Sequence, residues 1–255
     1  MYAYRYIDGM KAEGQENIIN LLRCAWAGSQ KYGALVWSGD IKSSFPSMKN
    51  QVAAGLNMGI AGIPWWTTDI GGFFGANIND PEFHELLVRW FEYGCFCPVM
   101  RLHGYRWPLQ PQYGTTGGAT CVSGAPNEVW SYTDQVCEIL SDYLRLRERM
   151  LPYITELMEE AHEKGTPVMR PLFYDFPEDK ESWNVETEYM FGPKVLVKPI
   201  TDADARETDV YLPGGASWTN AWTGETFEGG QKVHVAAPIE QIPLFTRDGY
   251  KLPMK

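Results

Sequence analysis

The sequence predicts an α/β domain built on a parallel sheet over residues 1–165, followed by an all-β domain of the sandwich type over residues 166–255. In the first part, short apolar runs alternate with segments of helical spacing, which is typical of parallel strands joined by crossover helices. After residue 165 the apolar runs are instead separated by Gly, Pro and Asn turns, which is the pattern of a β-sandwich.

The chain is predicted to begin with a helix and two strands. Residues 1–16 are amphipathic and end near a glycine, and the apolar run at residues 18–23 predicts a short strand closing on a charged residue. Residues 26–33 form a loop, and Ala34–Trp37 is the next strand. A hydroxyl cap and an early proline at residues 43–46 then predict the start of a second helix.

Two further strands are predicted at residues 63–66 and 98–103. Between them Asp80, Pro81 and Glu82 predict a helix start, as N-cap, first helical residue and first-turn acid. Four strands with their helices make about half of an eight-stranded α/β barrel. A doubly wound sheet is the alternative, although no G-x-G-x-x-G motif follows any of these strands.

The remainder of the first domain is a long loop and a helical stretch. Residues 104–126 are rich in Gly, Pro and aromatic side chains, and a loop of this length points to a functional segment or an insertion. Residues 127–164 carry one apolar stripe, which Pro152 is expected to kink or divide. The strands of the second domain are predicted at residues 168–172, 189–191, 195–197, 209–212, 233–236 and 242–245.

Composition and charge exclude several classes of function. Hydrophobic residues make up 44% and charged residues 21%, which fits a folded protein, and a net charge of −10 disfavours a nucleic-acid groove or an anionic membrane surface. Five cysteines without regular spacing do not suggest a disulfide framework. No cluster of metal ligands and no cofactor motif is found, so neither a metal site nor a bound cofactor is predicted.

The start of the chain lacks the pattern of a signal peptide. If the chain is a piece of a longer protein, this says nothing about compartment.

Two acids stand where predicted strands stop. Asp40 follows the strand that ends at Trp37, and Asp69 follows the strand at residues 63–66. Carboxyl ends of parallel strands carry the chemistry of α/β barrels, and cleavage of a glycosidic bond typically needs two carboxyl groups. One of them must stay protonated, which apolar neighbours favour. Asp40 is therefore a candidate general acid/base and Asp69 a candidate substrate ligand, although each of them also fits a turn or a helix cap.

Three further residues accompany these acids. Arg23 closes a predicted strand and is a candidate for binding sugar hydroxyls or a carboxylate, with a surface ion pair as the alternative. Phe73 follows two glycines and suits the floor of a sugar site, because aromatic rings pack against sugar C–H faces. His103 ends the last predicted strand, where a neutral imidazole can donate to a hydroxyl; a purely structural histidine is the alternative.

Several ordered motifs resemble glycoside hydrolase family 31. They are RCAWAGSQKY at residues 23–32, WSGD at 37–40, GIPWWTTDIGGF at 62–73, RW at 89–90 and RLHG at 101–104, with MFGP, VYLPG and WTG in the second domain. The resemblance covers nearly the whole chain. Cys24 is a departure, because the family more often has Ser after the arginine.

The resemblance implies the C-terminal half of a (β/α)8 TIM barrel, and retaining hydrolysis through a covalent glycosyl-enzyme. It implies Asp40 as the acid/base. It also implies that Arg23, Trp37, Asp69, Phe73 and His103 line the −1 sugar site. The nucleophile of the family is an Asp on an earlier strand, and no matching W-x-D stretch occurs in this chain.

The sequence thus predicts an exo-acting α-xylosidase or α-glucosidase whose nucleophile belongs to an upstream part of the same polypeptide. Its expected partners are that part and an oligosaccharide substrate, with no nucleic acid or membrane. The chain alone is expected to be inactive, because one carboxyl group cannot carry a double displacement. The alternative is a non-catalytic carbohydrate-binding or remnant protein that kept the sugar pocket.

Overall fold

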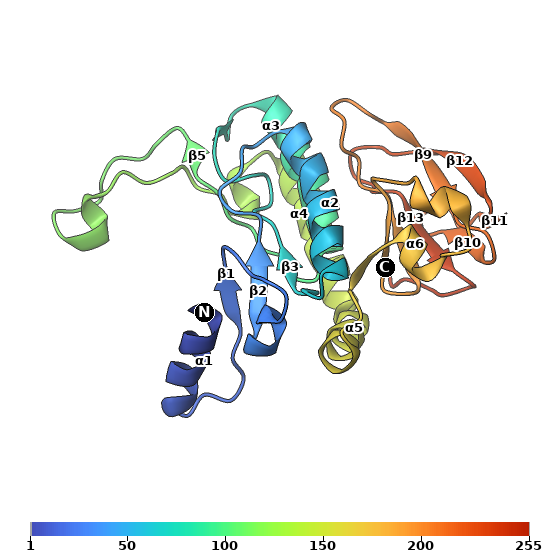
Figure 1. Ribbon diagram of the computed structural model, residues 1–255. Coiled ribbons are helices and arrows are strands. Elements are labelled where there is room, and N and C mark those ends of the chain that lie inside the picture. The colour runs from blue at the N-terminus through green and yellow to red at the C-terminus, as the bar shows by residue number, and fades with distance from the viewer. Residues whose placement is uncertain (1, 255) are drawn as a thin grey trace.

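The computed structural model describes residues 2–254, and its first part contains a small parallel sheet (Figure 1). Helix α1 (Tyr2–Ala12) precedes strands β1 (Asn20–Leu22), β2 (Ala34–Trp37) and β3 (Trp66–Thr67), which lie in the order β1-β2-β3 and are all parallel. The prediction of β2 is confirmed over its whole length. A short 3₁₀ helix, η1 (Ser29–Tyr32), lies in the loop between β1 and β2.

The third strand is shorter than predicted and shifted toward its carboxyl end. The amide of Ile63 still donates to the carbonyl of Met58 in the preceding helix, and Pro64 has no amide hydrogen to donate. Residues 63–65 therefore complete the helix end rather than the strand. Pairing to β2 starts where the carbonyl of Trp65 accepts from the amide of Val36.

The prediction of a continuous strand at residues 98–103 is wrong, because this segment forms only separate hydrogen bonds to its neighbour. The amide of Val99 donates to Trp66 and the carbonyl of Arg101 accepts from Ile70, but Leu102 forms only an isolated parallel bridge. Pro98 has no amide hydrogen, and its carbonyl accepts from the Arg147 guanidinium. The segment nevertheless follows the edge of β3, so its polar residues reach the same end of the sheet.

Helices α2 (Phe45–Ile60) and α3 (Pro81–Cys95) begin as the sequence predicts. Ser44 caps α2 by accepting from the amide of Ser47, and Asp80 caps α3 by accepting from the amide of Glu82. The predicted helix at residues 127–164 is divided into α4 (Asp134–Arg149) and α5 (Leu151–Lys164), which ends at Gly165. The division lies just ahead of Pro152, and a 3₁₀ turn, η3 (Val129–Ser131), precedes α4.

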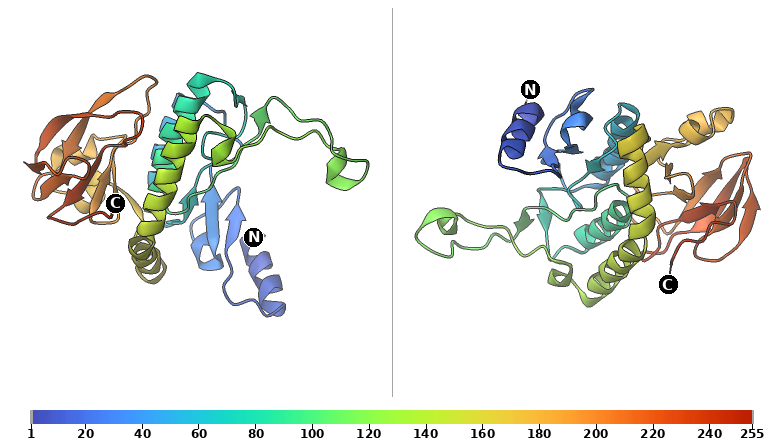
Figure 2. Two further views of the ribbon diagram at one scale, coloured as in Figure 1. Left: turned by 180° about the vertical axis from the view of Figure 1, so that it is seen from behind. Right: turned by 90° about the horizontal axis from the view of Figure 1, so that it is seen from below.

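Residues 104–126 form an arm that projects from the body of the molecule (Figure 1, Figure 2). Strand β5 (Arg106–Trp107) at its base pairs in parallel with β4 (Ala76–Asn77), and a 3₁₀ turn, η2 (Gly117–Thr120), forms its tip. Figure 2 places the arm on the side of the molecule opposite the C-terminal strands.

The C-terminal part is mainly antiparallel. A six-stranded sheet has the order β11-β10-β13-β8-β7-β6, and β12 and β9 form a separate two-stranded ladder. The strands are β6 (Met169–Pro171), β7 (Tyr189–Phe191), β8 (Val195–Val197), β9 (Glu207–Leu212), β10 (Ser217–Asn220), β11 (Thr226–Glu228), β12 (Gln231–Ala236) and β13 (Leu244–Arg247). The short helices α6 (Leu172–Asp175) and η4 (Lys180–Trp183) follow β6. The sequence did not predict β10 and β11, since polar side chains dominate both.

Two hydrophobic clusters form the core. The larger one joins the parallel sheet and its helices to β7, β8 and β13, and the smaller one fills the space between the six-stranded sheet and the β9–β12 ladder. The two parts of the chain therefore share one continuous interface. Within residues 2–254, no helix has both the length and the apolar character that crossing a membrane requires.

Candidate active site

The two candidate acids lie at neighbouring strand ends. Strands β2 and β3 pair with Trp37 opposite Thr67, so the next residues, Ser38 and Thr68, also face each other and their hydroxyl oxygens are 3.3 Å apart. Asp69 follows Thr68 directly, and Asp40 follows Ser38 after Gly39. The sheet thus brings together two acids that are separated along the chain, as the carboxyl edge of a parallel sheet does.

Arg23 and Asp40 form an ion pair at this edge. The guanidinium Nη2 of Arg23 donates to Oδ2 of Asp40 at 2.9 Å, and the carboxylate raises the pKa of Arg23 mainly through that hydrogen bond. The Arg23 guanidinium also lies 5.3 Å from the centre of the Trp37 ring. The side chains of Arg23 and Asp40 are 62% and 40% exposed. The residues that the structure describes therefore do not form the apolar surroundings expected for Asp40.

Asp69 has the opposite environment. Its side chain is fully buried, Oδ1 accepts from the Arg101 guanidinium, and Oδ2 has no hydrogen-bond partner among the described residues. Burial raises the pKa of the Asp69 carboxyl, against the opposing charges of Arg101 and His103. The side chain does not cap a turn, because it bonds to Arg101 rather than to backbone amides. A buried carboxylate oxygen without a partner is costly unless a ligand donates to it.

Phe73 and His103 lie beside these acids. Their ring centres are 5.5 Å apart, and the Phe73 ring stacks on Tyr105 with centres 6.5 Å apart. Backbone bonds fix this group: the amide of Phe73 donates to Ile41, and the amide of Tyr105 donates to the carbonyl of Phe73. The structure thus places all six predicted site residues along the carboxyl edge of the parallel strands and the loops that follow it.

Both parts of the chain match a known protein family. Residues 1–157 match the family described as "Glycosyl hydrolases family 31 TIM-barrel domain", and residues 165–252 match "Glycosyl hydrolase family 31 C-terminal domain". The chain belongs to glycoside hydrolase family 31. The resemblance predicted from its motifs is therefore confirmed.

Relatives within family 31 include α-xylosidases. An α-xylosidase of Saccharolobus solfataricus is 37% identical over 97% of this chain, which covers 31% of the relative. A GH31 α-xylosidase from a soil metagenome, solved in complex with xylose, is 54% identical with a TM-score of 0.94, over 98% of this chain and 37% of that chain. Alpha-glucosidase 2 of Bacillus thermoamyloliquefaciens is 34% identical over 93% of this chain, which covers 28% of it. The chain spans about a third of the length of these family 31 proteins.

Two arginines complete the site of this family 31 chain and were not predicted. Arg101 pairs with Asp69 and lies 5.9 Å from the Trp37 ring centre. Arg106 is fully buried and donates to the carbonyls of Ile70 and Gly72, at 3.2 and 2.7 Å. No carboxylate of residues 2–254 pairs with it, and burial lowers its pKa. The RLHGYR motif carries both arginines. An arginine in a loop is usually a surface group, so the spacing of the motif alone did not identify these two as site residues.

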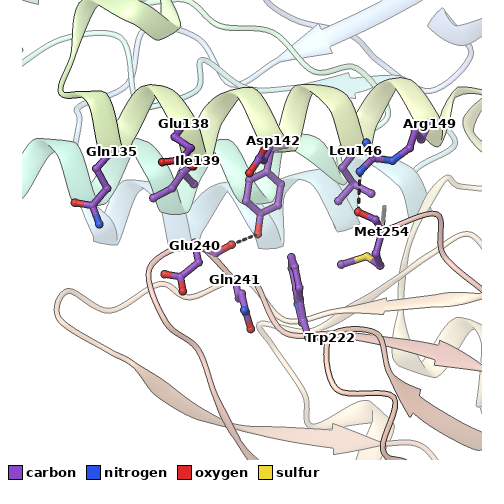
Figure 3. A pocket seen from close by; sticks show the side chains of 11 residues that line it. Gln135, Glu138, Ile139, Asp142, Leu146, Arg149, Trp222, Glu240, Gln241 and Met254 are labelled. Atoms are coloured by element: carbon purple, nitrogen blue, oxygen red, sulfur yellow. Dashed lines mark hydrogen bonds between the residues drawn. The ribbon is translucent and has the colours of Figure 1, made fainter.

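One other concave surface lies away from this site. A cavity of about 660 Å³ lies between α4 and loops of the C-terminal part, lined by Glu138, Asp142, Trp222 and Glu240 among others (Figure 3). None of the six predicted site residues lines it, so its chemistry is not that of the candidate site. In the described part of the chain, no three His, Cys, Asp or Glu side chains are grouped to hold a metal ion.

Proposed function

We propose that the polypeptide that carries this chain is a retaining, exo-acting α-glycoside hydrolase that releases α-linked xylose or glucose from oligosaccharide ends. The proposal rests on one observation above all: Asp40 and the buried, partly unpaired Asp69 follow neighbouring parallel strands. Similarity to the α-xylosidases of Saccharolobus solfataricus and the soil metagenome supports the substrate class.

Asp40 acts as the general acid/base in this proposal. It gives its proton to the glycosidic oxygen as the C–O bond breaks, and in the second step it takes a proton from the water that attacks the glycosyl-enzyme. Arg23 orients the carboxylate of Asp40 through the 2.9 Å bond. Exposure of the Asp40 carboxyl suits its role, because the leaving group and the attacking water must both reach it.

The −1 sugar binds between the remaining predicted residues. Asp69 accepts a sugar hydroxyl at Oδ2, which has no hydrogen-bond partner among residues 2–254. Phe73 and Trp37 offer ring faces to the C–H groups of the sugar, and His103 supplies a further polar contact at the exposed rim. Arg101 positions Asp69 through the ion pair between them.

The nucleophile belongs to the upstream part of the polypeptide, so the chain alone is expected to be inactive. One carboxyl group protonates the leaving oxygen, but a second must form the covalent bond to the sugar. We also propose that residues 1–165 are the C-terminal half of the (β/α)8 barrel and that residues 166–255 are a separate β-sandwich domain.

The test uses the full polypeptide with aryl α-xyloside and aryl α-glucoside as substrates. Hydrolysis of one of them, followed by proton NMR, is expected to give the α-anomer of the sugar as the first product. A β-anomer would contradict retention. If neither substrate is cleaved while the matching free sugar binds, the protein is a carbohydrate-binding protein and the enzymatic proposal fails.

A further inference from the structure

A line of aromatic side chains leads from the candidate site onto the arm. Tyr105 stacks on Phe73, with an angle of 24° between the ring planes, and follows His103 by two residues. Next to it lies a groove of about 390 Å³ that Tyr105 and Tyr113 line together. The groove thus reaches from Tyr105 at the base of the arm to Gly118 in its tip, and Tyr105 also stacks on Phe73 of the candidate −1 site.

The lining of this groove matches a neutral polyhydroxylated ligand. Its other lining residues are small or apolar, and none of them is charged: Gly104, Gly118, Cys121, Val122, Ser123, Gly124 and Ala125. The hydroxyls of Tyr105, Tyr113 and Ser123 make no hydrogen bond to any residue that the structure describes. Aromatic faces beside free hydroxyl donors suit sugar rings, whereas a phosphate or a nucleic acid would require positive charge.

The arm holds this groove in a defined shape. Gln110 and Ser123 exchange two backbone hydrogen bonds, at 2.8 and 3.2 Å, which join the two sides of the arm. The amide of Tyr113 donates to the carbonyl of Ala119 at 3.0 Å, although the Tyr113 side chain is 76% exposed. At the base, the buried Arg106 ties β5 to the turn that carries Phe73. These bonds fix the backbone that carries the Tyr113 ring, so less of the arm must be ordered when a ligand stacks on that ring.

We propose that the groove between Tyr105 and Tyr113 binds the sugar on the leaving-group side of the scissile bond. The occupant is the next neutral sugar unit of the oligosaccharide whose terminal unit lies between Asp69 and Phe73. This inference rests on the proposed hydrolase function. The arm then selects oligosaccharides over small glycosides, and Tyr113 is a specificity-determining residue rather than a catalytic one.

The test compares two substrates of the full polypeptide: a glycosyl fluoride, which has no sugar on its leaving-group side, and an α-linked oligosaccharide with the same terminal sugar. For Tyr113→Ala, kcat/KM on the oligosaccharide is expected to fall about five- to tenfold more than kcat/KM on the fluoride. Tyr113→Phe retains the ring and is expected to recover most of this difference. Trp183→Ala removes an exposed aromatic side chain from the C-terminal part and serves as the matched control, with no change in the ratio.

The outcomes separate the two proposals. If the wild-type protein cleaves both substrates and Tyr113→Ala leaves the ratio of kcat/KM values unchanged, the sugar-binding groove is wrong and the hydrolase proposal stands. An equal loss on both substrates would also contradict the groove, because a folding defect or a role at the −1 site explains it. If the wild-type protein cleaves neither substrate, both proposals fail.

Discussion

At the scale of single residues, the two acids of the site differ in burial and in partners. The Asp40 carboxylate is exposed and paired with Arg23, so it can exchange protons with a leaving group and with water. Asp69 is buried with one oxygen unpaired, and burial raises its pKa. Because the Asp69 side chain is shielded from water and held by Arg101, we assign it to binding rather than to proton transfer.

The substitution Asp69→Asn tests this assignment. An amide retains the shape of the side chain but weakens the acceptor, so kcat/KM of the full polypeptide is expected to fall about 10- to 100-fold, the loss of one charge-assisted hydrogen bond. Asp80→Asn is the matched control, because asparagine caps a helix as well as aspartate does. Wild-type kcat/KM in Asp69→Asn would contradict a contact between Asp69 and the substrate.

At the scale of elements, the turn after β3 determines where the site residues lie. Gly72 has φ +75°, and a Cβ there would lie 2.6 Å from the Cα of Ser43. The guanidinium of Arg106 also holds this turn in place by donating a hydrogen bond to the Gly72 carbonyl. The turn therefore packs against the loop that follows β2, where the amide of Phe73 also donates to the carbonyl of Ile41, and the loops after two neighbouring strands act as one unit.

Gly72→Ala is expected to disturb this unit more than a change at Gly39 does. Gly39 has φ +79° as well, but a Cβ there meets nothing within 4 Å. Both substitutions carry the left-handed backbone cost of about 1–2 kcal/mol, and Gly72→Ala adds an overpacking cost of about 1–3 kcal/mol. Urea unfolding of the two variants measures the difference. Equal stability would show that the contact between the two loops is not tight.

Element boundaries were predictable from the sequence where the signal is local. Asp80 and Pro81 start α3, Pro152 divides the last long helix, and the apolar run of β2 ends at Trp37. The ladder at residues 98–103 was not predictable in its real form, because Arg147 binds the carbonyl of Pro98 from a distant helix.

The same limit applies to the candidate site. Residues at strand ends, such as Asp40 and Asp69, could be found from the sequence, because parallel strands bring their carboxyl ends together. The roles of Arg101 and Arg106 depend on tertiary packing, which the local sequence does not encode. The exposure of Asp40 could not be predicted either, since it depends on which distant segments pack around the loop after β2.

At the scale of the whole molecule, a buried polar network joins α3 to the C-terminal part. Arg89 is fully buried and donates to the carbonyls of Ala205, Ala237 and Pro238, at 2.7 to 3.0 Å. It also pairs with Glu92, whose other oxygen accepts from the Tyr143 hydroxyl at 3.0 Å. Buried networks of this kind fix how two parts of a protein pack, and Nε of Arg89 is its one guanidinium nitrogen without a hydrogen-bond partner among the described residues.

This network predicts a pH dependence of stability. Burial raises the pKa of Glu92 from 4.5 to about 8, against the opposing effects of Arg89 and Tyr143. The folded state therefore retains a proton that the unfolded state releases, and the free energy of unfolding is expected to decrease as pH rises from about 4.5 to 8. The slope due to this group is at most about 1.4 kcal/mol per pH unit.

Glu92→Gln removes the titrating group and is expected to flatten this part of the profile. Urea unfolding of the wild type and the variant at several pH values between 5 and 8 measures the two slopes. Identical slopes would show that Glu92 is ionised in the folded protein throughout this range.

The most direct test of the role of Asp40 uses the Asp40→Ala variant of the full polypeptide. It measures how kcat/KM of this variant depends on the leaving group of the substrate. A dinitrophenyl glycoside needs no protonation of its leaving group, whereas an alkyl glycoside does. If Asp40 is the general acid, we expect kcat/KM on the alkyl glycoside to fall about 100- to 10,000-fold. The loss on the dinitrophenyl glycoside is expected to be much smaller. Wild-type hydrolysis of the alkyl glycoside by Asp40→Ala would contradict the assignment of Asp40 as the acid.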